Sequence, residues 1–263
     1  MADLRSVRPE MPSTVSFDVP ILMYHHLAAD GADVGAYSLG RAAFCRQLDA
    51  LVAWGYTPIT VSEVIAAAKG RRVLPAHPVA ITFDDGYQSF ADVALPALLQ
   101  RGICATVFVV VGEIGNWNRW DAGRGLPFQR LMGWADIRKA LSLGMEVGAH
   151  GWVHRDLTAS TRSELNEELV RSRGVLQDGL EAQVTCFSYP YGRYDIAHQE
   201  GLATAGYEGA VSIFSDEASV TANPYAMRRV YIHAGDGMLR FRAKVSQLYL
   251  RYLARRGAPK RRA

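Results

Sequence analysis

The sequence predicts a single α/β domain with parallel strands. Short apolar runs rich in β-branched residues alternate along the chain with amphipathic stretches of helical period. Strands that alternate with helices pair in parallel through right-handed crossovers, which leaves an open sheet or a barrel as the two possible arrangements. At 263 residues, with 49% hydrophobic and 21% charged residues, the chain has the composition of a globular protein with a substantial core.

Strands are expected where short apolar runs end in turn residues, and helices where apolar positions recur every three to four residues. The expected strands are residues 21–24, 79–83, 105–111, 145–149, 185–189, 210–214 and 230–233. The expected helices are residues 42–54, 90–101, 134–143, 162–178 and 196–205. Ser160 or Thr161, followed by Glu164, resembles a capping box that opens the fourth helix. Residues 112–128, rich in Gly, Trp and Arg, are expected to form a long loop over one face.

Several classes of protein are disfavoured by what the sequence lacks. No apolar stretch approaches the roughly 20 residues that a membrane-spanning helix needs. There is no glycine-rich phosphate fingerprint, no P-loop and no internal repeat. The three scattered cysteines, Cys45, Cys104 and Cys186, are expected to be free thiols.

Positive charge gathers at the C-terminal end. From Arg228 onward there are eleven Lys or Arg and one acid, Asp236, so this segment carries +10 and the remainder −7, for a net +3. This end could contact phosphates or an anionic membrane surface as a basic amphipathic helix, or it could be a solvated helix and tail. We divide the chain into an extension (1–18), a main domain (19–237) and a basic C-terminal helix and tail (238–263).

Two adjacent carboxylates, Asp84 and Asp85, stand where the apolar run 79–83 ends at a glycine. Two neighbouring anions at the rim of a core need a shared cation or proton, although a solvated Asp-Gly turn would give the same pattern. Downstream, His150 and His154 lie four residues apart, again directly after an apolar run. One carboxylate with two imidazoles is a common open metal site, and strand C-termini carry the chemistry of α/β folds.

Three segments resemble, in order and spacing, the motifs of the NodB-homology polysaccharide deacetylases (carbohydrate esterase family four). They are residues 82–86 (Thr-Phe-Asp-Asp-Gly), 150–154 (His-x-x-x-His) and 189–192 (Tyr-Pro-Tyr-Gly). The resemblance extends to residues 20–26 (Pro-Ile-Leu-Met-Tyr-His-His) and 225–230 (Tyr-x-x-x-Arg-Val), and so covers about 210 residues. It implies a deformed (β/α) barrel of about seven parallel strands, a divalent metal and hydrolysis of N-acetyl groups on sugars.

Carried over by position, the resemblance implies a role for each motif residue. Asp84 would be the general base, and Asp85, His150 and His154 would bind the metal. A backbone N–H near Tyr191 would help to stabilise the oxyanion. Zinc is the expected metal for such a site, with nickel, cobalt and iron as alternatives.

The sequence departs from the family's pattern at two positions. Gly151 stands where the family usually has a Ser or Thr, so a loop-fixing hydroxyl is missing. Ser188 stands where the family usually has an arginine, so the cation that orients the base must come from elsewhere. Arg229 is the candidate, because its motif resembles a late arginine in the branch that carries Tyr-Pro-Tyr-Gly.

A histidine is expected to act as the general acid, since its ordinary pKa of about 6.5 suits protonation of a leaving nitrogen near neutral pH. Tyr24-His25 resembles the N-terminal arrangement of some family members, so His25 is predicted. His26 and His233 are the alternatives, the latter because Tyr231-Ile232-His233 loosely matches a late Leu-x-His motif.

The expected function is removal of acetyl groups from an N-acetylated polysaccharide, oligosaccharide, or lipid- or nucleotide-linked saccharide. The alternatives are hydrolysis of another non-peptide C–N amide and a catalytically silent carbohydrate-binding protein. We expect no nucleic-acid partner, and the oligomeric state is left open. Residues 1–17 contain no apolar signal-peptide core, so a cytoplasmic location is expected, although a chain whose signal had been removed would look the same.

Overall fold

The computed structural model describes residues 18–28, 38–124, 126–215 and 222–256. The extension expected at 1–18, apart from its last residue, and the end of the basic tail from 257 onward lie outside the described residues. Within the described part, no helix combines the length and the apolar character that crossing a bilayer would require.

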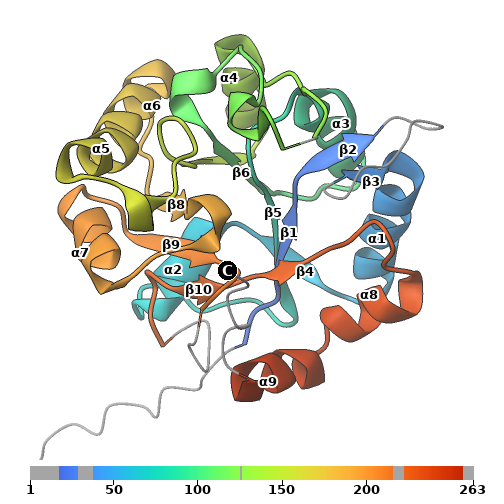
Figure 1. Cartoon of the computed structure of the whole chain (residues 1–263). Helices are drawn as coiled ribbons and strands as arrows, with labels where there is room; N and C mark the ends of the chain where they lie inside the picture. Colours follow the sequence, from blue (N-terminus) through green and yellow to red (C-terminus); the bar gives the residue numbers. More distant parts are fainter. Residues whose placement is uncertain (1–17, 29–37, 125, 216–221, 257–263) are drawn as a thin grey trace, which may run out of the picture.

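The centre of the molecule is a parallel sheet ringed by helices (Figure 1). Its strands are β1 Ile21–Tyr24, β4 Thr57–Ile59, β5 Pro78–Phe83, β6 Thr106–Val109, β7 Glu146–Ala149, β8 Cys186–Ser188, β9 Gly209–Ser212, β10 Met227–Arg228 and β11 Val230–Tyr231. Two further strands, β2 His26–Ala28 and β3 Ser38–Gly40, pair separately in parallel. The sheet order is β10-β9-β8-β7-β6-β5-β1-β11, with β4 paired to β5.

The sheet is nearly closed into a barrel by one interrupted strand. β10 pairs with β9 and β11 pairs with β1, and a single residue, Arg229, separates them. Counting β10 and β11 as one, the described residues place seven parallel strand positions around the barrel, which confirms the expected fold. The interruption leaves Arg229 at the seam, where its backbone N–H donates to the carbonyl of Ser212.

The helices that surround the barrel differ in regularity. They are α1 Arg41–Ala53, α2 Val61–Ala68, α3 Leu95–Leu99, α4 Trp134–Ser142, α5 Arg162–Asn166, α6 Ser172–Leu180, α7 Ile196–Thr204, α8 Met238–Lys244 and α9 Gln247–Arg256. The expected helix at 90–101 begins as a π-helical turn, η1 Phe90–Ala94, before α3. The expected helix at 162–178 is α5 and α6 joined by a second π-helical turn, η5 Glu167–Arg171. Its capping residue is Thr161, whose hydroxyl accepts from the backbone N–H of Glu164.

Alternation along the strands decides which side chains enter the barrel. In β5, Val79, Ile81 and Phe83 pack in the larger core cluster, which includes the helices α1, α4 and α6. Ala80 belongs instead to a smaller cluster that fills the barrel. Since side chains alternate across a strand, Asp84 continues the inward series of Ala80 and arrives inside the barrel at the end of β5.

Helix α2, which the sequence patterns did not predict, closes the end of the barrel where the strands begin. Val61, Val64 and Ile65 are buried in the same small cluster as Ala80. A capping box between Thr60 and Glu63 starts this helix. The opposite end, where the strands finish, is thereby the end open to a ligand.

The C-terminal helices α8 and α9 lie side by side against the outside of the barrel (Figure 1). In α8, Phe241 is fully buried. In α9, Tyr249, Leu250 and Leu253 pack towards the core, whereas Leu248 is exposed. The basic C-terminal segment therefore includes the expected helix, and one face of that helix is folded back on the protein.

Candidate active site

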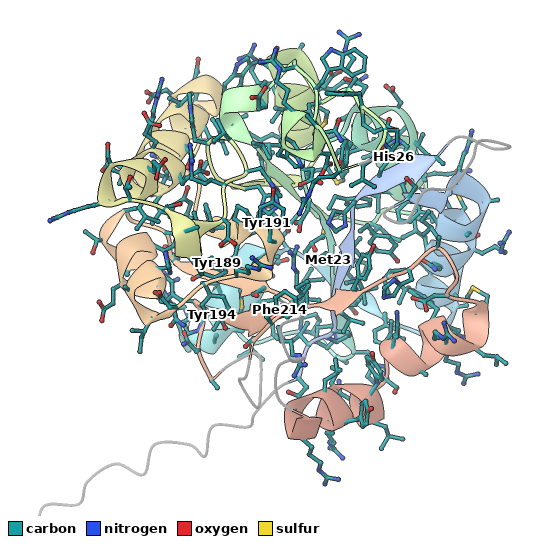
Figure 2. All side chains as sticks on the ribbon, viewed as in Figure 1. Met23, His26, Tyr189, Tyr191, Tyr194 and Phe214 are labelled. Carbon is teal, nitrogen blue, oxygen red and sulfur yellow. The ribbon has the colours of Figure 1, made fainter. Side chains whose placement is uncertain are left out.

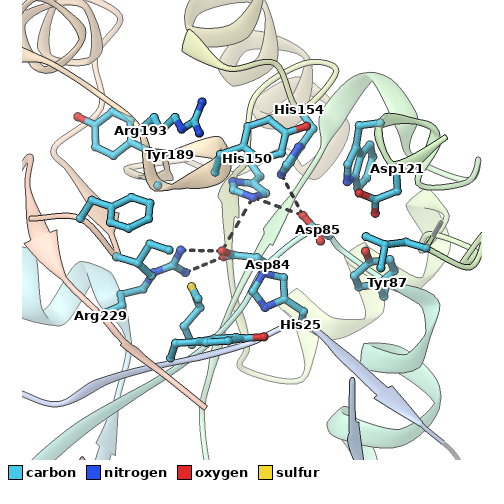
Figure 3. A pocket seen from close by; sticks show the side chains of 18 of the residues that line it. His25, Asp84, Asp85, Tyr87, Asp121, His150, His154, Tyr189, Arg193 and Arg229 are labelled. Carbon is cyan, nitrogen blue, oxygen red and sulfur yellow. Dashed lines mark hydrogen bonds and ion pairs between the residues drawn. The ribbon is translucent and has the colours of Figure 1, made fainter. Parts of the chain in front are cut away.

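One cavity of about 500 Å³ lies at the C-terminal ends of the strands (Figure 3). It brings together all seven predicted site residues, which come from five separate segments of the chain. They are His25, Asp84, Asp85, His150, His154, Tyr191 and Arg229. Figure 2 shows Tyr191 near the middle of the barrel mouth, with Met23, Tyr189 and Phe214 close by.

Arg229 forms a bidentate ion pair with Asp84. Its Nη1 and Nη2 atoms lie 2.7 and 2.6 Å from the two carboxylate oxygens, and both side chains are buried. Nη2 also donates to the hydroxyl of Ser188, at 2.9 Å. The cation beside Asp84 is thus Arg229, which lies between β10 and β11. Its side chain also contacts Ser188, the position at which the resemblance would have placed an arginine.

This pairing keeps Asp84 ionised. Burial by itself would raise the pKa of Asp84, but Arg229 and His150 outweigh burial and hold the pKa below its ordinary value. A buried carboxylate that stays charged and keeps a fixed orientation is suited to accept a proton from a water molecule in the cavity.

Asp85, His150 and His154 converge on one point. The Nε2 atoms of both histidines lie 3.4 Å from Oδ1 of Asp85. One potential ligand atom from each of the three buried residues lies within 4.8 Å of the others. Among the described residues no hydrogen bond satisfies Oδ1 of Asp85, although the atom is buried. One carboxylate oxygen and two imidazole nitrogens that face one another at a cavity wall form a three-ligand set, so the residues fit a divalent metal.

The surroundings of the two histidines agree with metal ligation. Nδ1 of His150 lies 2.7 Å from the carbonyl oxygen of Ser188, which can only accept, so Nδ1 carries the proton and Nε2 is left to bind a metal. Burial would lower the pKa of His150, but the neighbouring Asp84 and Asp85 raise it above its ordinary value. Burial lowers the pKa of His154 to about 3, so that imidazole is neutral and available as a ligand.

Three residues of the site have strained backbone conformations. The φ angles of Asp85, His154 and Tyr191 are 71°, 59° and 57°. These angles lie in the left-handed region, which residues other than glycine rarely adopt. Among the described residues only two other non-glycine residues share such angles. Strain of this kind persists where surrounding contacts enforce it, and it gathers at functional sites.

Of the three histidines considered as the acid, His25 is the one that lines the cavity. It lies next to the two aspartates (Figure 3), and burial lowers its pKa while Asp85 and Asp84 act to raise it. His26 lies on β2, away from the barrel mouth (Figure 2), with Nδ1 at 3.0 Å from the hydroxyl of Ser38. His233 follows β11 and is exposed.

Comparisons with known proteins agree with this geometry. The family model described as polysaccharide deacetylase matches residues 71–210, slightly more than half of the chain. The chain belongs to this family. YxkH of Bacillus subtilis, assigned to the polysaccharide deacetylases, is 24% identical over 242 residues, which cover 92% of this chain and 80% of YxkH.

Two further likenesses extend the comparison. The poly-β-1,6-N-acetyl-D-glucosamine N-deacetylase of Escherichia coli O157:H7 is 25% identical over 78% of this chain, but the match spans only 35% of that longer protein. The structure of the Streptococcus pyogenes deacetylase PplD, in complex with acetate, has the same fold. It aligns with a TM-score of 0.75 and 22% identity over 88% of this chain and 99% of PplD.

The deacetylase cavity also contains residues that the sequence patterns did not identify. Trp120, in the loop expected over one face, stacks on His154 with ring centroids 4.8 Å apart. Arg124 of the same loop lies over the ring of Tyr191, 5.0 Å from its centroid. The only signal in the sequence was the unusual density of Trp, Gly and Arg at 112–128. The loop was expected over one face of the fold, and it forms one wall of the cavity.

Tyr87 was also missed, because nothing in the sequence distinguishes it from a core aromatic. It is buried beside the cavity, and its hydroxyl contacts the carboxylate of Asp85 and the side chain of Asn118. Asn118 in turn donates to Asp121, at 2.9 Å, and accepts from the backbone N–H of Gln129. The loop is therefore tied through Tyr87 to the candidate metal site.

Proposed function

We propose that this deacetylase family member is a metal-dependent hydrolase that releases acetate from N-acetylated amino sugars. The substrate would be a polysaccharide, an oligosaccharide, or a lipid- or nucleotide-linked saccharide. The observation that carries the proposal is the pairing, in one cavity, of an ionised Asp84 held by Arg229 with the Asp85–His150–His154 cluster. An ionised base beside a three-ligand site is what hydrolysis of an unreactive acetamide requires.

The metal would be held by Asp85, His150 and His154, and zinc is the proposed ion, since imidazole and carboxylate ligands suit it. An ion bound there would polarise a carbonyl and would lower the pKa of water at the site to about 7. Trp120 packs on one face of His154, and Tyr191 packs edge-on against it at 4.5 Å. These contacts keep the imidazole in position.

The other residues would handle protons and charge. Asp84 takes the proton of the attacking water, and Arg229 holds its carboxylate in a single orientation. His25 protonates the departing nitrogen, from the cavity wall beside the aspartates. A backbone N–H near Tyr191 donates to the oxyanion, an assignment that follows from the resemblance and that the strained conformation of Tyr191 supports.

The lining of the cavity supports a saccharide. Trp120 and Tyr191 offer aromatic surface at its edge, and such rings commonly pack on sugars. The Escherichia coli relative named above acts on poly-β-1,6-N-acetyl-D-glucosamine, which is an N-acetylated polysaccharide. The likeness to that protein therefore favours an N-acetylglucosamine polymer or oligomer as the first substrate to test.

Acetate release tests the proposal directly. Purified protein is incubated with N-acetylglucosamine oligomers, other N-acetylated saccharides and simple non-sugar acetamides, with and without a chelator, and bound metal is measured in parallel. Acetate from the sugars alone, lost with chelator and restored by zinc, is the expected result. Activity on the non-sugar amides alone would favour a different C–N hydrolase, and bound sugar without turnover or metal would favour a silent binding protein.

We also propose that the C-terminal helices contact an anionic membrane surface. The described residues of α8 and α9 carry basic side chains and no Asp or Glu. Leu239 and Leu248 are 89% and 77% exposed, whereas Leu253 packs inward. Exposed leucines among arginines match the two attractions of an anionic bilayer surface, apolar and electrostatic.

A further inference from the structure

The backbone between the two candidate metal histidines is bound on both sides. On one side, the carbonyls of Gly151 and Trp152 accept from the N–H groups of Val111 and Gly112, at 3.0 and 2.8 Å. On the other side, the N–H of Trp152 donates to a carboxylate that comes from a distant helix. These hydrogen bonds hold the loop by its backbone. They could take the place of the side-chain hydroxyl that Gly151 lacks.

That carboxylate belongs to Glu168, which is 1% exposed. Its Oε2 accepts from the N–H of Trp152 at 2.7 Å, and its Oε1 accepts from the N–H of Val153 at 3.2 Å. The backbone N–H of Arg155 is a further donor to it. Glu168 therefore binds the residues immediately before and after His154, whose own φ of 59° is strained.

The position of Glu168 depends on an irregular helix. It lies in the π-helical turn η5 between α5 and α6, helices that pack outside the barrel near β8 (Figure 1). Single π turns inside α-helices occur frequently at functional sites. From the same turn, Arg171 lies over the ring of Trp152, 4.0 Å from its centroid.

Gly151 and Glu168 are matched to each other. A Cβ added at Gly151 would overlap Oε2 of Glu168, so any other residue there would push the carboxylate off the loop. The φ of Gly151 is +81°, which glycine adopts without strain. The absence of a side chain at 151 is what leaves room for the carboxylate.

We propose that Glu168 is a positioning residue for the candidate metal site. It holds residues 151–155 in the conformation that turns Nε2 of His150 and of His154 towards Asp85. This role rests on the proposed metal-dependent function, because it concerns the same three ligands. Glu168 touches neither substrate nor metal and acts only through the loop.

Zinc affinity of the full chain, measured by competition with a chromophoric chelator, tests the role without recourse to activity. Glu168→Gln keeps the size of the side chain but replaces one acceptor oxygen with a donor. The zinc affinity should fall by about 10–100-fold, as it does when a residue that orients metal ligands is replaced. Glu167→Gln removes the same charge one residue away, from an exposed side chain, and should leave the affinity unchanged.

An unchanged affinity in Glu168→Gln, with zinc still bound by the unaltered chain, would overturn the positioning role alone. Failure of the unaltered chain to bind any divalent metal would instead overturn the metal site, and the positioning role with it. Urea unfolding of the metal-free variants shows whether a loss of affinity is only a loss of fold.

A second set of variants tests the match between Gly151 and Glu168. Gly151→Ala should also weaken zinc binding, because its methyl group displaces the carboxylate. In a chain that already carries Glu168→Ala, Gly151→Ala should lower the zinc affinity much less, because the effects of substituting two residues in contact are not additive. Gly144→Ala is the control for backbone strain, because Gly144 has a φ of +86° and open space around it. Fully additive effects of the two substitutions would contradict the proposal.

Discussion

Asp84 and Asp85 are neighbours in the chain, yet they have different partners. Asp84 ends the inward-facing series of β5 and is held by Arg229. Asp85 follows in a left-handed conformation, which turns its side chain towards the two histidines. Asp84, the proposed base, and Asp85, the proposed metal ligand, are therefore turned towards different partners although their Cα atoms are only about 4 Å apart.

Substitution of the two aspartates should separate their roles. Asp84→Asn should retain bound metal and lose about 10²–10⁴-fold in kcat, because an amide cannot accept the water's proton. Asp85→Asn should release the metal, since a charged ligand is lost from the cluster. Metal analysis and acetate release on the same preparations check both, and the reverse pattern would show that the assignments are exchanged.

The general acid should be identified by comparing three histidines. His25→Ala should lower kcat by about 10²–10⁴-fold, because His25 lines the cavity beside the aspartates. His26→Ala and His233→Ala are the matched controls, and each should change kcat little, as neither lines the cavity. A larger loss in His233→Ala than in His25→Ala would refute the assignment.

At the scale of elements, the barrel uses its two ends differently. The open end carries the site, whereas α2 closes the other end with Val61, Val64 and Ile65. A half-buried residue, Glu146 at the start of β7, accepts through its carboxylate from the backbone N–H groups of Val61 and Ser62 at 2.9 and 3.2 Å. It satisfies donors that the first turn of a helix leaves unpaired, so it attaches α2 to the barrel.

Loss of this attachment should affect stability rather than catalysis. Glu146→Gln should lower the free energy of unfolding by about 1–3 kcal/mol, because an amide N–H donor replaces one of the two oxygens that accept from the donors of Val61, Ser62 and Thr106. The kcat should stay the same, since the cavity lies at the other end of the barrel. Urea denaturation measures the change, with the exposed Glu200→Gln as a control expected within about 0.5 kcal/mol. Equal stabilities of the two variants would contradict this role for Glu146.

At the scale of the whole molecule, the basic helices lie on the outside, across the barrel from α4 (Figure 1). One face of α9 packs inward, and Arg228 fixes the helix by donating to the carbonyl of Leu253, at 2.7 Å. A membrane contact would therefore use only the outward residues, such as Leu248, and would involve the protein as a rigid unit.

Sedimentation with lipid vesicles should reveal that contact. The full chain should sediment with anionic but not neutral vesicles, and added salt should release it, because screening weakens the attraction of basic residues. The double variant Leu239→Glu/Leu248→Glu should bind much less, whereas Lys139→Glu on α4 should bind as well as the unaltered chain. Binding that is absent, or equal in all three proteins, would leave the helices with a purely structural role.

Much of the fold was predictable, because periodic patterns report which face of an element is buried. The seven expected strands are all present, with ends that differ by up to two residues. The patterns did not predict the short strands β2, β3, β4 and β10, nor the eight-residue helix α2, because elements this short give a weak period. The expected C-terminal helix is present as two helices, α8 and α9. The expected helix at 162–178 is present but interrupted, since a π turn leaves the overall amphipathic pattern intact.

By itself the sequence determined the order of strands and helices and placed Asp84, Asp85, His150 and His154 at strand ends, because both follow from residue pattern along the chain. Only the tertiary structure decided which distant side chains complete the site. The resemblance named Arg229 as the candidate partner of Asp84, and the structure shows how it reaches Asp84, through a break in the last strand and across 145 residues of sequence. Glu168 reaches the histidine loop through a π turn. Such pairings depend on where separate elements pack in space, which no local pattern records; the metal, the substrate and the cellular location stay predictions.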